Sequence, residues 1–266
     1  ETLQMIQDSY MLAQNDIIEW RKIANWPTDD QVEQDLIISV CLVKIFNHPY
    51  LNNRLAFRGG TALNKLIFPK ALRYSEDIDM NRLENENAGP IIDSIREALK
   101  SVFSKKAKFK STDQSIKLMY TYSSIIGQDR KLKIEINVRE TLPQEKIVEY
   151  PFEVNSGFFS GKASIRGFCK EEIIGTKIRA LYQRTKGRDL FDLYELGKLD
   201  LDWDKIVNSF KKLDIGASSN DFKKNLEEKM KEPMFIEDIV PLLPTDAHYS
   251  VYDAHEWFVN NLLERL

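Results

Sequence analysis

The chain has 266 residues, of which 42% are hydrophobic and 30% charged, and its formal net charge is −3. This length accommodates one large domain or two small ones, and the composition is that of an ordinary soluble globular protein. The slight negative charge argues against a protein that binds nucleic acid with its whole surface. Cys41 and Cys169 are too few for a disulfide framework and suit a reducing cytoplasm. No run of 18 apolar residues predicts a membrane span, and we expect no membrane partner.

The N-terminal part is predicted to be helical. Apolar residues recur at helical spacing over 3–25. Thr28 and Gln31 have the spacing of a capping box and predict a second helix over 28–46. A further amphipathic helix is predicted over 90–104.

A glycine turn follows the N-terminal helices. The apolar run 55–57 predicts a short buried strand that stops at Gly59 and Gly60. Thr61 is then expected to cap a short helix that Pro69 ends. A helix that begins after two glycines presents free backbone N–H groups and the positive end of its dipole, which suits phosphate.

Three polar residues spaced by two come next. Ser75, Asp77 and Asp79 would share one face of a strand, whereas Ile78 and Met80 would point into a core. Neighbouring carboxylates repel each other, and a cation between them removes the repulsion. Hard oxygen ligands near a phosphate-binding turn describe a Mg²⁺ site for nucleotide chemistry. An Asp-x-Asp pair alone is common on solvated strand edges, and the glycine turn is what makes this one more specific.

Alternating apolar residues predict two antiparallel strands over 115–123 and 131–139. Glu135 lies on the polar face of the second strand and is the candidate third carboxylate, with a plain solvent-facing residue as the alternative. The lysine-rich run 105–110 either contacts phosphates or forms a solvated connection.

The C-terminal half begins with an irregular or β connection over 151–168, followed by helices. In the segment 170–193, Lys177 and Arg184 are seven residues apart and would point the same way. Asp189 is expected to open the next helix. The alternatives are a solvated Lys177, an N-capping Asp189, and Asp192 as a salt-bridge partner, which we favour for Asp192. Further helices are predicted over 203–212, 221–231 and 254–265.

Two of these segments resemble a known family. The run Gly-Gly-Thr-Ala-Leu-x-Lys at 59–65, followed by Arg-Tyr-Ser-Glu-Asp-Ile-Asp at 73–79, closely resembles the AbiEii/MenT group of nucleotidyltransferase-like toxins in the DNA polymerase β-like superfamily. Lys177 and the Asp189 segment resemble the later motifs of that group. The resemblance implies an α+β fold with a mixed sheet core, N-terminal helices and a helical C-terminal half that closes the cleft. We expect two domains, one of residues 1–150 with the N-terminal helices and the sheet core, and a mainly helical one of residues 151–266.

The resemblance also implies an activity, which is nucleotidyl transfer from an NTP to RNA, at the acceptor end of tRNA, by a toxin with a cognate antitoxin. Two Mg²⁺ ions would assist attack by a terminal hydroxyl on the α-phosphate. Lys177 would neutralise phosphate charge in the transition state, and Asp189 would orient Lys177 or the incoming group. The metal ligands would be Asp77, Asp79 and Glu135. The triphosphate would be held by Gly59, Gly60, Thr61, Lys65, Ser75 and Lys177.

Charge is unevenly distributed over the C-terminal half. Residues 162–188 hold eight Lys or Arg against two Glu, and we interpret this basic stretch as the RNA track, with Arg166, Arg184 and Lys186 as phosphate contacts. Two other hypotheses stay open. One is transfer of a nucleotide onto protein or a small molecule, and the other is a non-catalytic protein that uses the same scaffold only for binding.

Overall fold

The computed structural model describes residues 12–139, 143 and 145–266. The chain divides into two units that interleave along the sequence. The sheet unit comprises Glu1–Phe57, Glu76–Thr141 and Glu149–Gly167, and the helical unit comprises Arg58–Ser75, Leu142–Val148 and Phe168–Leu266. Strand β6 (Val148–Asn155) runs through residue 150, where the sequence suggests a boundary, and the division there stays a prediction.

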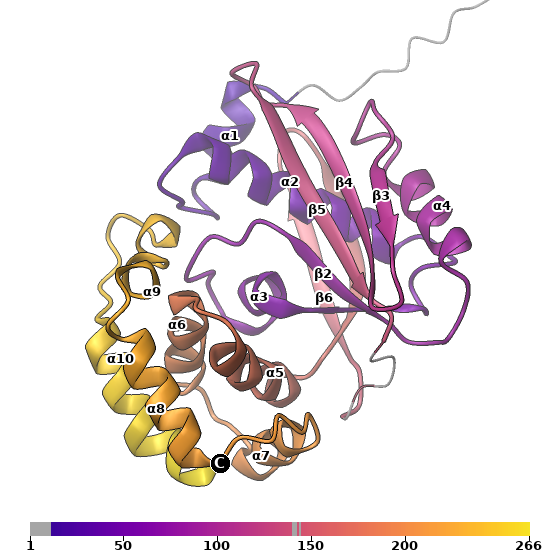
Figure 1. The fold of residues 1–266 in the computed structure, drawn as a ribbon. Helices are drawn as coiled ribbons and strands as arrows, with labels where there is room; N and C mark the ends of the chain where they lie inside the picture. Colours follow the sequence, from indigo (N-terminus) through magenta and orange to yellow (C-terminus); the bar gives the residue numbers. More distant parts are fainter. Residues whose placement is uncertain (1–11, 140–142, 144) are drawn as a thin grey trace, which may run out of the picture. The chain divides into compact units, whose positions relative to one another are not determined.

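The sheet unit is built on one mixed sheet of seven strands in the order β3-β4-β5-β2-β1-β7-β6 (Figure 1). The pairs β1–β7 and β2–β5 are parallel, whereas β3–β4 and β4–β5 are antiparallel. The mixed sheet confirms the expected fold class. The strands are β1 (Leu55–Arg58), β2 (Ile78–Arg82), β3 (Lys108–Ser111), β4 (Ser115–Ser123), β5 (Asp129–Asn137), β6 (Val148–Asn155) and β7 (Ser160–Gly167).

Period-two alternation gives the central strands one apolar and one polar face. The apolar face carries the buried side chains Ile78, Met80, Ile116, Leu118, Tyr120, Leu132, Ile134 and Ile136. Tyr122 lies on the same face and donates its hydroxyl to Oε1 of Gln34 in α2 (Asp29–Phe46), 3.1 Å away, so α2 packs on this side. The polar face is therefore the one that carries Asp79 and Glu135.

Two helices precede the first strand. The capping box of Thr28 and Gln31 starts α2 as predicted. Helix α1 (Gln14–Trp20) is shorter than the predicted 3–25, and residues 1–11 of that prediction lie outside the described residues. Asp35 of α2 accepts hydrogen bonds from the indoles of Trp20 and Trp26, at 2.8 and 3.0 Å, and so ties α1 to α2.

Two sequence-based assignments need correction. Helix α4 (Ala88–Ala98) starts before Pro90 and ends well before residue 104, because Leu99 leaves helical geometry. The lysine-rich run contains strand β3, whose register with β4 supplies order that its own polar sequence does not indicate. Of the two alternatives for residues 151–168, the β connection is confirmed, because these residues form most of β6 and all of β7.

The helical unit packs around aromatic side chains. Phe222 contacts the rings of Tyr182, Phe210 and Phe258, with centroids 5.0, 6.2 and 5.7 Å away. In the described ranges, no helix is both long and apolar enough to cross a bilayer. The elements are α3 (Gly59–Ala62), η1 (Leu63–Ile67), α5 (Lys170–Gln183), α6 (Gly187–Leu196), α7 (Trp203–Lys211), α8 (Ser219–Lys229), α9 (Pro233–Glu237), η2 (Val240–Leu242), α10 (Val251–Trp257), η3 (Phe258–Leu262) and η4 (Leu263–Arg265).

Candidate functional site

Two of the carboxylates predicted as metal ligands, Asp79 and Glu135, lie on the polar face of the sheet. Asp79 in β2 is the register partner of Glu135 in β5, so their side chains leave the sheet on the same side. Asp77 comes just before β2, and the burial of Ile78 and Met80 preserves the predicted alternation. Ser75 does not share this strand, because β2 begins only at Ile78.

Lysine ammonium groups lie among these carboxylates. Nζ of Lys133 is 2.9 Å from Oδ2 of Asp77 and 3.3 Å from Oε2 of Glu135, and Nζ of Lys117 is 3.1 Å from Oε1 of Glu135. Burial alone would raise the pKa of Glu135, but the hydrogen bond from Lys117 and the charges of both lysines lower it. Burial would likewise lower the pKa of Lys133, and the surrounding carboxylates raise it instead.

The same geometry tests whether a divalent cation fits. Within the described residues, no three His, Cys, Asp or Glu side chains are grouped closely enough to hold an ion. The donor chemistry nevertheless suits a hard cation: Asp79 and Glu135 share a face, Asp77 shares the ammonium of Lys133 with Glu135, and all three offer carboxylate oxygens. The ammonium of Lys133 bridges Asp77 and Glu135, so a positive charge already lies between these two carboxylates. Magnesium itself stays a prediction.

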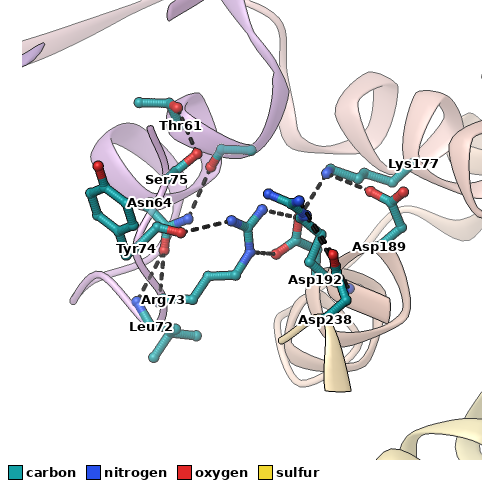
Figure 2. A network of polar contacts seen from close by, with 12 residues as sticks. Thr61, Asn64, Leu72, Arg73, Tyr74, Ser75, Lys177, Asp189, Asp192 and Asp238 are labelled. Carbon is teal, nitrogen blue, oxygen red and sulfur yellow. Dashed lines mark hydrogen bonds and ion pairs between the residues drawn. The ribbon is translucent and has the colours of Figure 1, made fainter. Parts of the chain in front are cut away.

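The glycine turn belongs to the helical unit. Gly59 has φ = +81°, a left-handed conformation that favours glycine, and it turns the chain from β1 directly into α3. The N-cap position is therefore Arg58, and the prediction of Thr61 as the cap is wrong. The Thr61 hydroxyl instead lies 2.7 Å from that of Ser75, which brings two of the predicted triphosphate ligands together (Figure 2). Lys65 lies in η1.

Arg73 links this turn to α6. Its guanidinium makes a two-pronged salt bridge with Asp192, with Nε 2.7 Å from Oδ1 and Nη2 2.8 Å from Oδ2 (Figure 2). A Cβ atom on Gly60 would lie 2.5 Å from Nη2 of Arg73, so glycine is what allows the guanidinium to pass the turn. The side chain of Asn64 holds the backbone before Tyr74 in place, because its Oδ1 accepts hydrogen bonds from the N–H groups of Leu72 and Arg73.

Lys177 of α5 extends the network to a second aspartate. Its Nζ is 2.9 Å from Oδ1 of Asp189 and 2.8 Å from Oδ2 of Asp192. Arg184 donates to both oxygens of Asp189, at 2.6 and 2.8 Å, so Lys177 and Arg184 do converge as their spacing predicts. Lys177 is buried and not a solvated helix lysine, and Lys186 rather than Asp189 is the N-cap of α6. Asp192 is the salt-bridge partner we favoured.

The network keeps its carboxylates ionised. Asp189 and Asp192 are fully buried, and burial alone would raise their pKa values. Lys177 and Arg184 lower the pKa of Asp189, and Arg73 and Lys177 lower that of Asp192, so both pKa values fall below the usual range. Three cations and two anions thus form a chain from the glycine turn to Arg184.

The basic stretch makes protein contacts of its own. Arg166 donates to the carbonyl of Asn53 at 2.8 Å. Lys186 lies 3.2 Å from Oδ1 of Asp238, which also accepts from Arg188. With Arg184 paired to Asp189, each predicted RNA contact has a partner in its own unit.

Sequence reasoning missed Arg73, Lys117 and Lys133 as parts of these clusters. Arg73 stands two residues before Ser75 and opens the Arg-Tyr-Ser-Glu-Asp-Ile-Asp segment. Its position in this segment could have identified it as part of the site. Lys117 and Lys133 lie on the polar faces of predicted strands, so the predicted pairing of those strands would have placed them beside Glu135.

The chain is similar to known nucleotidyltransferase toxins. A family model described as nucleotidyl transferase AbiEii toxin, type IV toxin–antitoxin system, matches residues 41–260. The solved structure of MenT4, a nucleotidyltransferase toxin from Mycobacterium tuberculosis H37Rv, is similar with a TM-score of 0.63 and 15% identity, over 96% of this chain and 91% of that one. A nucleotidyltransferase-like antigenic protein from Paracoccidioides brasiliensis aligns at 16% identity and a TM-score of 0.39, over 79% and 94% of the two chains. No curated protein matches the sequence significantly. The similarity to MenT4 shows a shared fold.

Proposed function

Because the chain belongs to the AbiEii family of nucleotidyl transferase toxins from type IV toxin–antitoxin systems, we propose that it transfers nucleotides from an NTP to RNA in the cytoplasm. The proposed acceptor is the terminal hydroxyl of tRNA. The family match confirms the resemblance carried by the glycine turn and the Asp-x-Asp segment, and it implies a nucleotide substrate and an antitoxin partner.

The observation that carries the proposal is the pairing of Asp79 with Glu135 across two parallel strands, with Asp77 two residues before Asp79. These three side chains would hold the Mg²⁺ ions. Bound Mg²⁺ supplies activation of a hydroxyl and neutralisation of phosphate charge. Lys133 pairs with Asp77 and Glu135, and Lys117 pairs with Glu135, so the lysines balance the charge of two of these carboxylates.

The triphosphate is assigned to the glycine turn. Gly59 and Gly60 bring backbone N–H groups to the start of α3, and the paired hydroxyls of Thr61 and Ser75 add two hydrogen-bonding groups. Lys65 adds a positive charge from η1.

Lys177 is proposed to stabilise negative charge on the transferring phosphate, and Asp189 to orient it. The hydrogen bond from Nζ of Lys177 to Asp189, at 2.9 Å, supports the orienting role. A buried ammonium held by two aspartates needs little reorganisation during the reaction, which is the condition for strong electrostatic catalysis.

A second candidate function is transfer onto a protein or a small molecule. It is favoured by the partners that Arg166, Arg184 and Lys186 already have, since paired cations attract RNA phosphates less than free ones do. These three residues stay candidate RNA contacts.

The deciding experiment incubates the purified chain with each labelled NTP and total RNA, with Mg²⁺ or with a chelator. We expect label in RNA from one or a few NTPs, only with Mg²⁺. Asp77→Ala should abolish transfer, while Glu76→Ala, which alters the exposed acidic neighbour, should retain it. Label in protein and none in RNA would favour the second candidate, and full transfer by Asp77→Ala would refute the carboxylate assignment.

A further inference from the structure

The polar face of the sheet carries a row of charged residues that crosses four strands. Register pairs join Lys110 of β3 to Lys117 of β4, Lys117 to Glu135 of β5, and Glu135 to Asp79 of β2. Register partners in neighbouring strands leave a sheet on the same side. Lys108, two residues before Lys110, shares this side, so a lysine end and a carboxylate end belong to one surface.

An independent contact fixes the direction of the lysines in β3. Phe109 lies between them and points the other way, because the guanidinium of Arg96 in α4 stands over its ring at 5.0 Å. Figure 1 shows α4 beside β3, and β4 between β3 and β5. Lys108 and Lys110 therefore face away from α4, and both are exposed.

The charge of the two outer strands has one sign. Together β3 and β4 contain three lysines and no acidic residue. Lys117 is paired with Glu135, but no carboxylate among the described residues forms an ion pair with Lys108 or Lys110. In this they differ from Arg184 and Lys186 of the basic stretch, which have aspartate partners.

We infer that Lys108, Lys110 and Lys117 form a track for the phosphates of the RNA acceptor strand, which ends at Asp79 and Glu135. This inference rests on the proposed function, because it names the route by which RNA reaches the carboxylates. The row runs from positive to negative charge, so the terminal hydroxyl lies at the carboxylates and the backbone phosphates lie over the lysines. Three strand spacings, about 14 Å in all, separate β3 from β2. A stacked strand covers this length with about four nucleotides.

The test compares two double variants that remove the same charge. Lys108→Gln/Lys110→Gln removes the outer end of the track, and Lys223→Gln/Lys224→Gln removes two exposed lysines of α8. The affinity for purified tRNA is measured between about 50 and 200 mM salt, the range over which phosphate contacts change affinity strongly. We expect the first variant to bind roughly tenfold more weakly at 0.15 M salt and to have a salt slope smaller by about 1.4, which is two contacts at 0.7 each. NTP affinity without RNA should equal that of the parent.

Each result separates this inference from the function on which it rests. If the parent labels no RNA, the proposed function fails. If the parent labels RNA and the Lys108/Lys110 variant keeps the parent's salt slope, the track is refuted. These lysines would then only protect the edge strand β3 against pairing with another sheet, a common role of edge lysines. An equal loss in the Lys223/Lys224 variant would also refute it, because the effect would come from net charge alone.

Discussion

The two charged clusters of this protein differ in burial and in the kind of pairing they contain. On the sheet, the side chains of Asp77, Glu135 and Lys133 are 33%, 26% and 31% exposed, and each lysine contact is made by a single ammonium. In the helical unit, Asp189 and Asp192 are 0% exposed and are gripped by the guanidinium groups of Arg184 and Arg73.

Because of this difference, the carboxylates on the sheet can exchange their partners, whereas the buried aspartates are held in a fixed geometry. A partly exposed carboxylate beside a flexible lysine can release that lysine and accept a metal ion at little cost, because surface ion pairs contribute about 0–1 kcal/mol. A buried pair with two parallel hydrogen bonds is costly to break. We therefore interpret the sheet cluster as the reactive one and the buried cluster as the frame that positions Lys177.

The sharpest way to break this comparison is to remove one aspartate from each cluster. Asp192→Ala should lower the free energy of unfolding by about 3–5 kcal/mol, because Arg73 and Lys177 would lose a buried counter-charge. Asp77→Ala should change it by about 1 kcal/mol or less while abolishing transfer. Urea unfolding of both variants measures the contrast. Equal stability losses would contradict it.

The frame also predicts how its stability depends on pH. The pKa of Asp192 is lower in the folded protein than in the unfolded chain. Its contribution to the free energy of unfolding is therefore complete above about pH 4. It is lost as the pH falls through the folded value. The stability difference between the parent and Asp192→Ala should therefore shrink in acid.

The proposed role of Lys177 in stabilising phosphate charge predicts a catalytic effect. Lys177→Ala should lower kcat by roughly 10²–10³-fold, the scale for one preorganised charge stabiliser. Lys177→Arg should not restore the rate fully, because a planar guanidinium cannot replace a compact ammonium between Asp189 and Asp192. Lys170→Ala, at the start of the same helix, is the control. If folded Lys177→Ala turns over like the parent, the lysine is purely structural.

The contact between Gly60 and Arg73 predicts a smaller effect on stability. Gly60→Ala should cost about 1–3 kcal/mol, because its Cβ would collide with a guanidinium that Asp192 holds in place. Gly89→Ala is a matched control, since a Cβ there meets nothing within 4 Å. In an Arg73→Lys background the cost of Gly60→Ala should fall, and a double-mutant cycle of unfolding free energies measures the coupling. If the stability costs of Gly60→Ala and Arg73→Lys simply add, the close contact with Arg73 is not the reason for glycine at position 60.

Sequence reasoning reached the sheet cluster better than the buried frame. Strict alternation along β2 and β5 determines which side chains share a face, and it predicts the polar faces on which the structure has Asp79 and Glu135. The bridge from Arg73 to Asp192 spans 119 residues, and no local pattern indicates which distant carboxylate a buried arginine meets. Strand β3 was missed because Lys-Phe-Lys-Ser lacks an apolar face, and only pairing with β4 orders it.

The last prediction is confined to alkaline pH and concerns Lys229 at the end of α8. This buried lysine donates to the carbonyls of Leu181 and, at 2.7 Å, Tyr182, and so caps the end of α5 next to Arg184. Burial lowers its pKa to about 8. The unfolded chain, with a lysine pKa of about 10.4, therefore binds more protons between these two values, and Lys229 makes stability rise with pH across that window. The rise in the free energy of unfolding should be at most about 3 kcal/mol.

This rise should disappear in Lys229→Met and persist in the exposed-lysine control Lys223→Met, when the free energy of unfolding is measured from pH 7.5 to 10 by urea titration. Parallel pH profiles of the parent and Lys229→Met would show that the cap stays charged throughout and that α5 is held independently of pH.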